Sequence, residues 1–371
     1  MSIANREMKE RAAQLHRTAI VVDTHCDTTQ RLLDPAWDIA KRHEHGHVDI
    51  PRLREGGYGA VFFAVWAPGP AQPGAGVAAA RRQVDCIKKA VVDHAGDLAL
   101  ACSAGEIRAA READKIAVVI AIEGGYLIED SLDVLRDYRA LGAAYMTLTH
   151  GFHTSWADSS GIHRPLAPRH GGLTNFGRDV VREMNRIGMM VDVSHVSDAT
   201  FRDVLETAEK PVIATHSCCR ALSLHPRNLS DEMMKALAET GGLMQINFAA
   251  GFLDPDFPDL DPDDIEAFFA AGCPSDEPLT DYLTPFSLLV DHFDHALQTI
   301  GPDHVGIGSD FDGVPALPVG MEDCSKLVNL TAALLQRGYD EDDLLKVLGG
   351  NVLRVMDACQ ATIGASHPDH E

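Results

Sequence analysis

The chain has 371 residues, of which 45 % are hydrophobic and 23 % charged, the balance of an ordinary globular protein with a sizeable core. Its formal net charge of −23 argues against nucleic acids and anionic membrane surfaces, because both require a basic face. Apolar stretches such as 60–67 and 117–122 are far shorter than the roughly 20 residues that cross a bilayer.

The two ends of the chain and its cysteines bear on where the protein works. The first residues are polar and helical in character, which predicts a polar helix over about 1–18 rather than a secretory signal. The polar C-terminus carries no lipid-anchor signal. Eight cysteines occur without a Cys-x-x-Cys pair. We therefore expect a cytoplasmic protein with reduced thiols and no membrane partner.

Short apolar, β-branched runs alternate with amphipathic stretches along the chain. We predict eight strands, at 20–24, 60–66, 117–122, 144–149, 190–194, 211–215, 242–247 and 304–308. Helices are predicted between them at 77–93, 132–141, 174–187, 197–207, 231–240 and 285–299. Apolar strands that alternate with helices are typical of a parallel sheet buried on both faces. Eight such units predict a (β/α)8 TIM-like barrel that forms one domain over 1–371.

An open, doubly wound sheet is the alternative for this alternation. Its phosphate-binding fingerprint is missing, because Gly306 and Gly308 lack the third glycine and are followed by Asp310 rather than a helix start. Two segments, 27–58 and 252–285, are longer than normal connections and are expected to be functional. The second is acidic and proline-rich. It lacks the spacing of a calcium loop, so we expect a solvated acidic loop insertion.

Ligand-type side chains fall where the predicted strands end, and such ends meet at one face of a barrel. They are His25 and Asp27 on the first strand, Glu123 on the third, His150 on the fourth, His195 on the fifth, His216 on the sixth, and Asp310 and Asp312 on the eighth. Each one alone could be structural, as a satisfied polar residue, a helix cap or a turn. Their coincidence on six strands predicts a common site. Other histidines, including His43, His45 and His47, fall away from strand ends and are expected to be structural.

This set of side chains suits metal-assisted hydrolysis. Three histidines, one aspartate and one glutamate provide enough donors for two divalent ions with one carboxylate between them. Nitrogen and oxygen donors without a thiolate suit zinc, although manganese or cobalt also fit. Paired metals lower the pKa of a shared water and stabilise a developing oxyanion, which is hydrolytic chemistry.

Several motifs follow one another in a fixed order over about 20–357. They are His25-x-Asp27, Glu123-Gly124-Gly125, Thr147-Leu148-Thr149-His150, Trp156-Ala157-Asp158, Asp192-Val193-Ser194-His195, Thr215-His216-Ser217, Arg227-Asn228, Gly308-Ser309-Asp310-Phe311-Asp312-Gly313 and Gly350-Asn351-Val352-Leu353-Arg354-Val355. This series resembles the membrane (renal) dipeptidase family of zinc metallopeptidases. The resemblance implies a binuclear zinc dipeptidase that cleaves dipeptides with a free C-terminal carboxylate. Its substrates would include L,D-dipeptides. It also implies a homodimer.

The resemblance implies a metal site with two zinc ions. His25 and Asp27 would bind one zinc, His195 and His216 the other, and Glu123 would bridge the two ions.

The resemblance also implies roles toward the substrate. His150 would contact the scissile carbonyl oxygen and stabilise the tetrahedral intermediate. Arg227 would bind the C-terminal carboxylate, for which a fixed guanidinium is suited. Asp310 would take a proton from the bridging water and pass it to the leaving amine.

The chain departs from the family at three positions. Phe152 stands where a cysteine is expected, and Phe252 stands where a tyrosine is expected. Cys26 replaces a residue that is often asparagine, and we expect it to point away from the metals. With no signal or anchor segment in view, the chain resembles a soluble bacterial-type member. The pocket wall near 252–285 is the part that the resemblance leaves open.

Two other functions stay open from the residues alone. One is another barrel metallohydrolase, acting on a lactone, phosphoester or cyclic amide. Such relatives often bridge their metals with a carboxylated lysine, whereas here Glu123 ends the third strand. The other is a non-catalytic, metal-binding descendant of an enzyme, which is disfavoured because the ligand set is complete.

Overall fold

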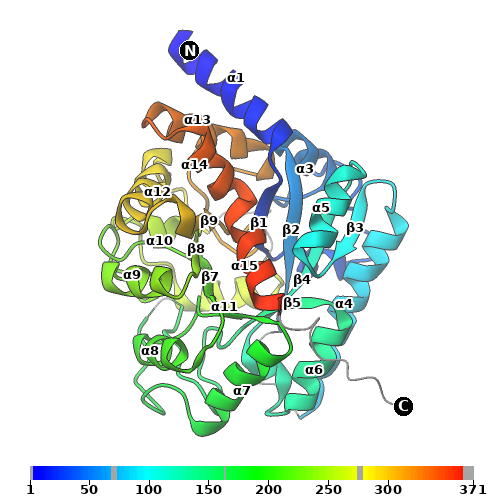
Figure 1. Cartoon of the computed structure of the whole chain (residues 1–371), viewed down its shortest axis with the longest axis vertical. Coiled ribbons are helices and arrows are strands. Elements are labelled where there is room, and N and C mark those ends of the chain that lie inside the picture. Colours follow the sequence, from blue (N-terminus) through cyan, green and yellow to red (C-terminus); the bar gives the residue numbers. More distant parts are fainter. Residues whose placement is uncertain (1–2, 68–72, 163, 274–278, 362–371) are drawn as a thin grey trace.

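The apolar runs form a single parallel sheet in the computed structural model, which describes residues 3–67, 73–162, 164–273 and 279–361. The strands are β1 (Val21–Cys26), β2 (Tyr58–Val65), β3 (Leu98–Ala101), β4 (Ile116–Glu123), β5 (Ala143–Thr147), β6 (Met190–Asp192), β7 (Val212–Ser217), β8 (Leu243–Ile246) and β9 (Val305–Ile307). Eight of them pair side by side in the order β1-β2-β4-β5-β6-β7-β8-β9, with helices arranged around them (Figure 1). The predicted (β/α)8 barrel is confirmed.

The seam between β9 and β1 closes the barrel through the residues that follow β9. The Asp310 N–H donates to the His25 carbonyl at 2.9 Å, and the Asp27 N–H donates to the Phe311 carbonyl at 2.8 Å. The first and last parts of the barrel therefore join through the main chain of predicted site residues.

The sequence analysis did not predict β3. Leu98–Ala101 is a run of leucine and alanine, which are good helix formers without β-branching, so its composition hides the strand. It pairs with residues 116–119 of β4, whereas β5 pairs with residues 120–123. β3 therefore extends the sheet beside the barrel wall and does not enter the ring of eight.

The helices occupy the polar and amphipathic stretches. They are α1 (Ile3–Thr18), α2 (Thr29–Leu32), α3 (Ile50–Gly56), α4 (Ala75–Asp93), α5 (Ala104–Glu112), α6 (Leu132–Leu141), α7 (Asn175–Arg186), α8 (Asp198–Thr207), α9 (Asp231–Glu239), α10 (Ala250–Leu253), α11 (Pro262–Ala270), α12 (Phe286–Ile300), α13 (Leu327–Gln336), α14 (Glu341–Leu345) and α15 (Asn351–Gln360). Several begin after a serine or threonine that accepts a backbone N–H, as Ser131 does from Val134 and Ser197 from Thr200. No helix in these described ranges is long and apolar enough to cross a membrane.

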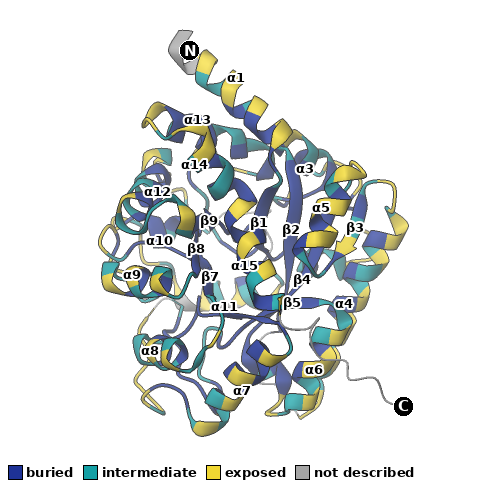
Figure 2. Cartoon of the chain, viewed as in Figure 1, coloured by how far each residue is buried: buried dark blue, intermediate teal, exposed yellow. Residues whose placement is uncertain are grey.

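Alternation along β4 shows how the barrel interior is built. Ile120 and Ile122 belong to the outer core between sheet and helices, while Val119 and Ala121 belong to an inner cluster that also contains residues of α15. Because side chains alternate along a strand, Glu123 continues the inner series and points into the barrel. The eight strands of the ring are buried throughout, and the surrounding helices carry exposed residues on their outer faces (Figure 2). The strand end is the place where this apolar interior becomes polar.

The expectation of a plain acidic loop over 252–285 was wrong in part, because the segment contains α11. Asp261 accepts a hydrogen bond from the Asp263 N–H, so it caps the helix, and Pro262 occupies the first turn. Aspartate at the N-cap and in the first turn, with proline at the start, is a helix-start signal. The acidic residues near 261 therefore begin a helix rather than mark an irregular loop.

Candidate active site

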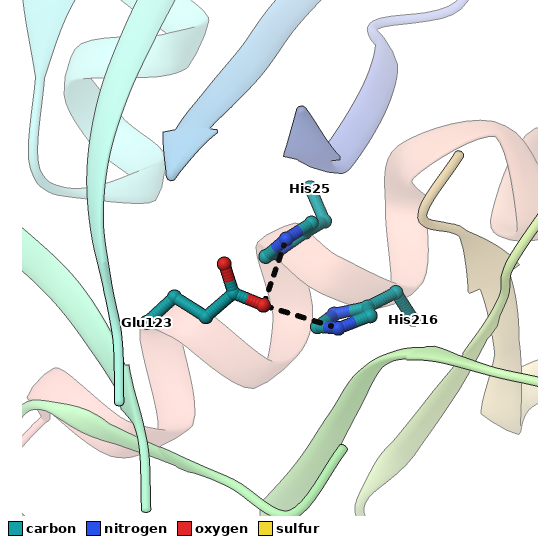
Figure 3. A group of neighbouring side chains, drawn as sticks. All are labelled: His25, Glu123 and His216. Atoms are coloured by element: carbon teal, nitrogen blue, oxygen red, sulfur yellow. Dashed lines mark ion pairs between the residues drawn. The ribbon is translucent and has the colours of Figure 1, made fainter. Parts of the chain in front are cut away.

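Glu123 lies at the centre of a buried cluster at the carboxyl ends of the strands. Its Oε1 atom lies 3.4, 3.1 and 3.5 Å from the Nε2 atoms of His25, His195 and His216. Figure 3 shows this oxygen beside the stacked rings of His25 and His216, whose centroids are 3.7 Å apart, with an ion pair to each ring. The Nε2 atoms of His195 and His216 are themselves 2.9 Å apart. One carboxylate oxygen is thus shared by imidazoles from three strands or strand ends.

The remaining predicted strand-end residues surround this centre. His25 Nε2 lies 3.7 Å from Asp27 Oδ2 and 3.9 Å from Asp310 Oδ1. His150 Nε2 lies 3.7 Å from Glu123 Oε1, and its ring centroid is 4.7 Å from that of His195. The structure therefore brings all five predicted metal-binding residues together with His150 and Asp310.

His25 is held in one tautomer by Tyr145, an inward-facing residue of β5. The Tyr145 hydroxyl donates its proton to the Thr24 carbonyl at 2.9 Å, and its oxygen lies 2.8 Å from His25 Nδ1. Because the hydroxyl proton is already used, Nδ1 of His25 must be the donor in this pair. The lone pair of a neutral His25 is then on Nε2, the atom that faces Glu123.

His216 is held in the same tautomer through a different network. The Thr215 hydroxyl donates to Asp192 Oδ2 at 2.7 Å and lies 2.8 Å from His216 Nδ1, which must therefore donate to it. Asp192 is fully buried and also accepts hydrogen bonds from the Thr147 and Ser194 hydroxyls. A saturated carboxylate at the barrel centre thus fixes the orientation of His216.

Asp310 adopts an unusual backbone conformation that aims its carboxylate into the site. Its φ is +64°, a left-handed conformation that aspartate tolerates better than most residues. Asn247 donates from Nδ2 to Asp310 Oδ2 at 2.8 Å. The main chain at Gly313 also lies close to the carboxylates, because an added Cβ there would be 2.0 Å from Asp27 Oδ2 and 2.5 Å from Asp310 Oδ1. A glycine is required there because the main chain itself borders the carboxylates.

Asp312 does not join the cluster, although it ends the same strand. Its Oδ1 accepts from the His47 N–H at 2.7 Å, its Oδ2 accepts from the Thr28 hydroxyl at 2.6 Å, and its own N–H donates to His47 Nδ1 at 2.8 Å. Asp312 therefore fastens the 27–58 segment to the end of β9. The expectation that His47 lies away from strand ends was wrong, because the long loop folds back onto one.

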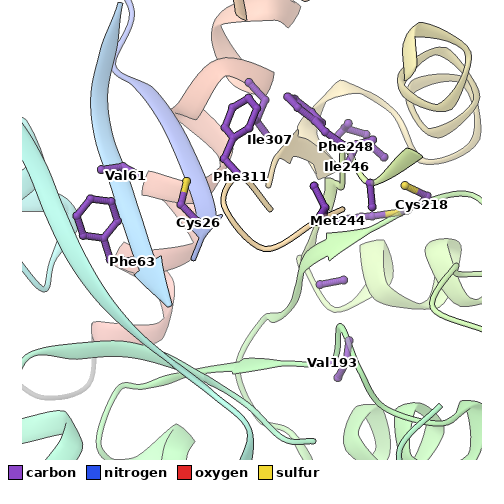
Figure 4. Packing of buried hydrophobic residues seen from close by; sticks show 14 of the residues in the cluster. Cys26, Val61, Phe63, Val193, Cys218, Met244, Ile246, Phe248, Ile307 and Phe311 are labelled. Carbon is purple, nitrogen blue, oxygen red and sulfur yellow. The ribbon is translucent and has the colours of Figure 1, made fainter. Parts of the chain in front are cut away.

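Cys26 lies between the two first-strand site residues but does not face them. Its side chain is in the hydrophobic core, and its Sγ is 3.8 Å from the Ser309 hydroxyl (Figure 4). Phe311, between Asp310 and Asp312, lies in the same core.

Phe152 contacts Tyr126, with ring centroids 4.9 Å apart, and approaches His150 edge-on at 6.4 Å.

Arg227 is a buried cation beside the cluster. The residue is 1 % exposed, and its Nη2 donates to the His216 carbonyl at 3.1 Å. Its Nε and Nη1 have no hydrogen-bond partner among the described residues. Phe252 lies under the guanidinium, 5.5 Å from its carbon to the ring centroid. Burial lowers the pKa of Arg227 to about 10, so the group stays charged at neutral pH. Buried, charged and unpaired donors suit an anionic ligand.

The electrostatics of the cluster favour cations. Burial lowers the pKa values of His195 and His216 well below the usual range, so both rings are neutral and available as ligands. Burial also opposes protonation of His25, but the carboxylates of Glu123, Asp27 and Asp310 outweigh it and raise the pKa of His25 to about 10. The buried carboxylates thus favour a positively charged group at their centre, either a protonated His25 or a bound cation.

The donor geometry fits divalent ions. Three overlapping groups, each with ligand atoms within 4.8 Å of one another, are formed by His25, Glu123 and His216, by Glu123, His150 and His195, and by His25, Asp27 and Asp310. His25 Nε2, which faces Glu123, has no hydrogen-bond partner among the described residues. An orphaned imidazole nitrogen in a buried carboxylate cluster is a donor that zinc and similar ions use.

The cluster forms the base of a cavity of about 1490 Å³. Its wall combines the site residues Asp27, Glu123, His150, His195 and Asp310 with Arg227. Trp66, which follows β2, also lines it and donates from Nε1 to Asp27 Oδ1.

Sequence reasoning missed four residues that support the cluster: Trp66, Tyr145, Asp192 and Asn247. Trp66 and Asn247 end predicted strands, so the rule that selected the other site residues would have found them. Asp192 and Tyr145 stand inside apolar strands, where an inward polar residue signals a buried network. Both signals were present in the sequence, but the prediction considered only residue types that are common as metal ligands or acids.

Buried imidazoles and carboxylates at the carboxyl end of a parallel barrel define the class of barrel metallohydrolases. Comparison with known proteins narrows the class. The family model described as membrane dipeptidase (peptidase family M19) matches residues 9–368. The chain therefore belongs to this family of metallopeptidases and is a hydrolase that acts on peptide bonds.

Individual relatives agree with this assignment. Human dipeptidase 3 is 34 % identical over 355 residues, which cover 94 % of this chain and 67 % of the human protein. The crystal structure of the probable dipeptidase PvdM from Pseudomonas aeruginosa has a TM-score of 0.83 at 26 % identity, covering 96 % of this chain and 99 % of that one. A metallopeptidase from Rhodobacter sphaeroides, liganded with a phosphinate mimic of the dipeptide L-Ala-D-Ala, has a TM-score of 0.79 at 28 % identity, covering 92 % and 99 % of the two chains.

Proposed function

We propose that the protein is a binuclear zinc dipeptidase that hydrolyses dipeptides with a free C-terminal carboxylate, L,D-dipeptides among them. The observation that carries this proposal is the position of Glu123, whose single Oε1 atom is shared by His25, His195 and His216. A carboxylate between separate imidazoles is the arrangement that bridges two ions.

The donors divide into two sets around this bridge. His25 and Asp27 would hold one ion, and His195 and His216 the other, with Glu123 common to both. The fixed tautomers of His25 and His216 support this division, because each presents Nε2 to the bridge. Bound ions would supply acidity to a water and polarise the scissile carbonyl.

Arg227 would orient the substrate by its C-terminal carboxylate. Its unpaired Nε and Nη1 are buried, and a carboxylate would satisfy both while neutralising the charge. The stack on Phe252 holds the guanidinium in place. Because Arg227 is enclosed, it would accept a terminal carboxylate but no residue beyond it, so the proposed site would release a single C-terminal residue.

His150 and Asp310 would move protons and charge at the scissile bond. His150 lies beside Glu123 and is suited to donate to the carbonyl oxygen as negative charge develops there. Asp310, held by Asn247, would take a proton from the attacking water and deliver it to the leaving nitrogen. One carboxylate can serve both steps because it returns to its starting state.

Turnover of L,D-dipeptides is proposed from the Rhodobacter sphaeroides relative, which binds a phosphinate mimic of L-Ala-D-Ala. The cytoplasmic location and the homodimer stay predictions.

A kinetic panel tests the proposal. Protein reconstituted with zinc should hold two ions per chain and hydrolyse both L-Ala-L-Ala and L-Ala-D-Ala. Metal content measured on the same sample separates a poorly loaded enzyme from an inactive one. A protein that holds two ions but hydrolyses no dipeptide would contradict the proposal and favour the non-catalytic alternative.

A further inference from the structure

The acidic segment builds a wall of the substrate cavity. We define the roof segment as residues 254–273, which includes α11. Most of its side chains that line the cavity are apolar, and several carboxylates are exposed. The apolar lining residues include Phe257, Leu260, Ile265 and Phe269; Asp254 and Asp259 also line the cavity, and the carboxylates of Asp256, Asp261, Asp263 and Asp264 are exposed. The segment is therefore amphipathic, with a mainly apolar side toward the site.

The roof segment crosses the mouth of the barrel. It starts after β8 and ends near Trp66, which follows β2. Phe269 meets the Trp66 ring edge-on with centroids 6.1 Å apart, and Phe268, Cys273 and Trp66 share a small hydrophobic cluster. Arg31 of α2 donates from Nη2 to the Cys273 carbonyl at 3.0 Å, which fastens the far end of the segment.

The order of the strands in the ring determines which end of a bound dipeptide lies against the roof segment. Arg227 contacts the His216 carbonyl of β7, and Trp66 follows β2. β2 and β7 stand four places apart in the ring of eight, so they lie on opposite sides of the barrel mouth. A dipeptide with its carboxylate on Arg227 and its scissile bond over Glu123 extends its amino-terminal residue toward Trp66.

We infer that Trp66 and Phe269 form an apolar subsite for the side chain of the amino-terminal residue. The substrates would be dipeptides with a large apolar residue, such as leucine or phenylalanine, in that position. The inference rests on the proposed dipeptidase function and adds the substrate class. The cavity supports it, because about 1490 Å³ exceeds the roughly 300–1,000 Å³ of an ordinary small-ligand pocket and far exceeds what two alanines fill.

The size of the preference follows from burial of the extra side chain. Each methylene placed in an apolar pocket changes specificity by about tenfold or more. Leucine and phenylalanine should therefore exceed alanine at the amino-terminal position by at least about tenfold in kcat/KM. An aspartate at the same position should be disfavoured, because the apolar wall offers its charge no partner.

The test compares Gly-Ala, Ala-Ala, Leu-Ala, Phe-Ala and Asp-Ala on the zinc-loaded protein and on three variants. Phe269→Ala should lower the ratio of kcat/KM for Phe-Ala to kcat/KM for Ala-Ala about tenfold. Phe269→Leu, which keeps the helix apolar, should fall in between. Ala267→Ser changes an exposed position of the same helix and should leave the whole panel unchanged. Thermal melting of each variant shows whether the fold is retained.

The outcomes separate the two proposals. Turnover of Ala-Ala as efficient as that of Leu-Ala and Phe-Ala, or an equal loss for all dipeptides in Phe269→Ala, would overturn the subsite while leaving the dipeptidase intact. Absence of turnover for every dipeptide would overturn the proposed function, and the subsite with it.

Discussion

The strand ends and the roof segment face each other across the same cavity, but different interactions hold their side chains in place. At the strand ends, charged side chains are buried and fixed by short polar contacts, such as those from Tyr145 to His25 and from Asn247 to Asp310. In the roof segment, most side chains that line the cavity are apolar, and the far end is attached by the apolar cluster of Trp66, Phe268 and Cys273 and by the hydrogen bond from Arg31 to the Cys273 carbonyl. The difference indicates that the barrel fixes the chemistry, whereas the roof segment can vary in sequence and so set the substrate.

The largest effect is expected at the strand ends, from Asp310→Asn. The amide keeps the size of the side chain but cannot accept a proton, so kcat should fall by about 10²- to 10⁴-fold. Metal analysis should still find two ions, since Asp310 is not among the five proposed metal ligands. Steady-state kinetics with metal content measured in parallel checks this, and a variant of undiminished kcat would exclude Asp310 as the proton carrier.

Arg227→Met should come next. Removing one partner of a buried charge pair costs about 2–5 kcal/mol, which predicts a loss of roughly 30- to 5,000-fold in kcat/KM for dipeptides. A dipeptide amide, which lacks the carboxylate, should lose far less, and this substrate pair is the internal control. Equal losses for the acid and the amide would mean that Arg227 acts through the fold rather than through the carboxylate.

The junction between the two regions should make stability depend on pH through His292 of α12. Its Nδ1 accepts from the Cys219 N–H at 3.0 Å, and its Nε2 donates to the Leu253 carbonyl just before the roof segment. Burial lowers the pKa of His292 to about 4 from an ordinary value near 6.5. The folded state therefore binds this proton more weakly than the unfolded state, and stability is full above pH 6.5 and lost as pH falls toward 4.

The shift corresponds to about 3 kcal/mol over that pH window. Urea unfolding between pH 7.5 and 4.5 measures it. His292→Gln should be less stable at pH 7.5 but should show a shallower fall toward acid. An identical pH dependence in the variant would assign the acid sensitivity to other buried histidines.

The smallest of these effects is expected from Tyr145→Phe, which removes the partner of His25 Nδ1 together with the hydrogen bond to the Thr24 carbonyl. Loss of an orienting partner behind a metal-binding histidine typically lowers metal affinity by about 10- to 100-fold. Competition with a chelator measures this directly. Tyr138→Phe is a matched control, because the Tyr138 hydroxyl donates to the Leu127 carbonyl, outside the cluster. Equal zinc affinity in both variants would show that His25 needs no fixed tautomer.

Sequence pattern predicted the barrel well because the strands of the ring are apolar runs that alternate with helical stretches. It placed Glu123, His195 and Asp310 in one site because residues typical of metal ligands or acids fall at the ends of six of those runs. It missed β3, because alanine and leucine look helical, and it missed α11, because its helix-start residues look like an acidic loop. Hydrogen-bond partners such as Tyr145 depend on which side chains meet across the ring. That information lies in the packing and not in a single strand.

The site is complete only when the seam between β9 and β1 has formed, because that seam joins two segments that are far apart in the sequence. The bonds that close it run between the main chain of His25 and Asp27 and that of Asp310 and Phe311, which lie at nearly opposite ends of the chain. Contacts between such distant segments are slow to form, because a large loop must close first. Recovery of activity during refolding therefore reports on completion of the whole barrel, and a chain released early from synthesis has no partial site with which to act.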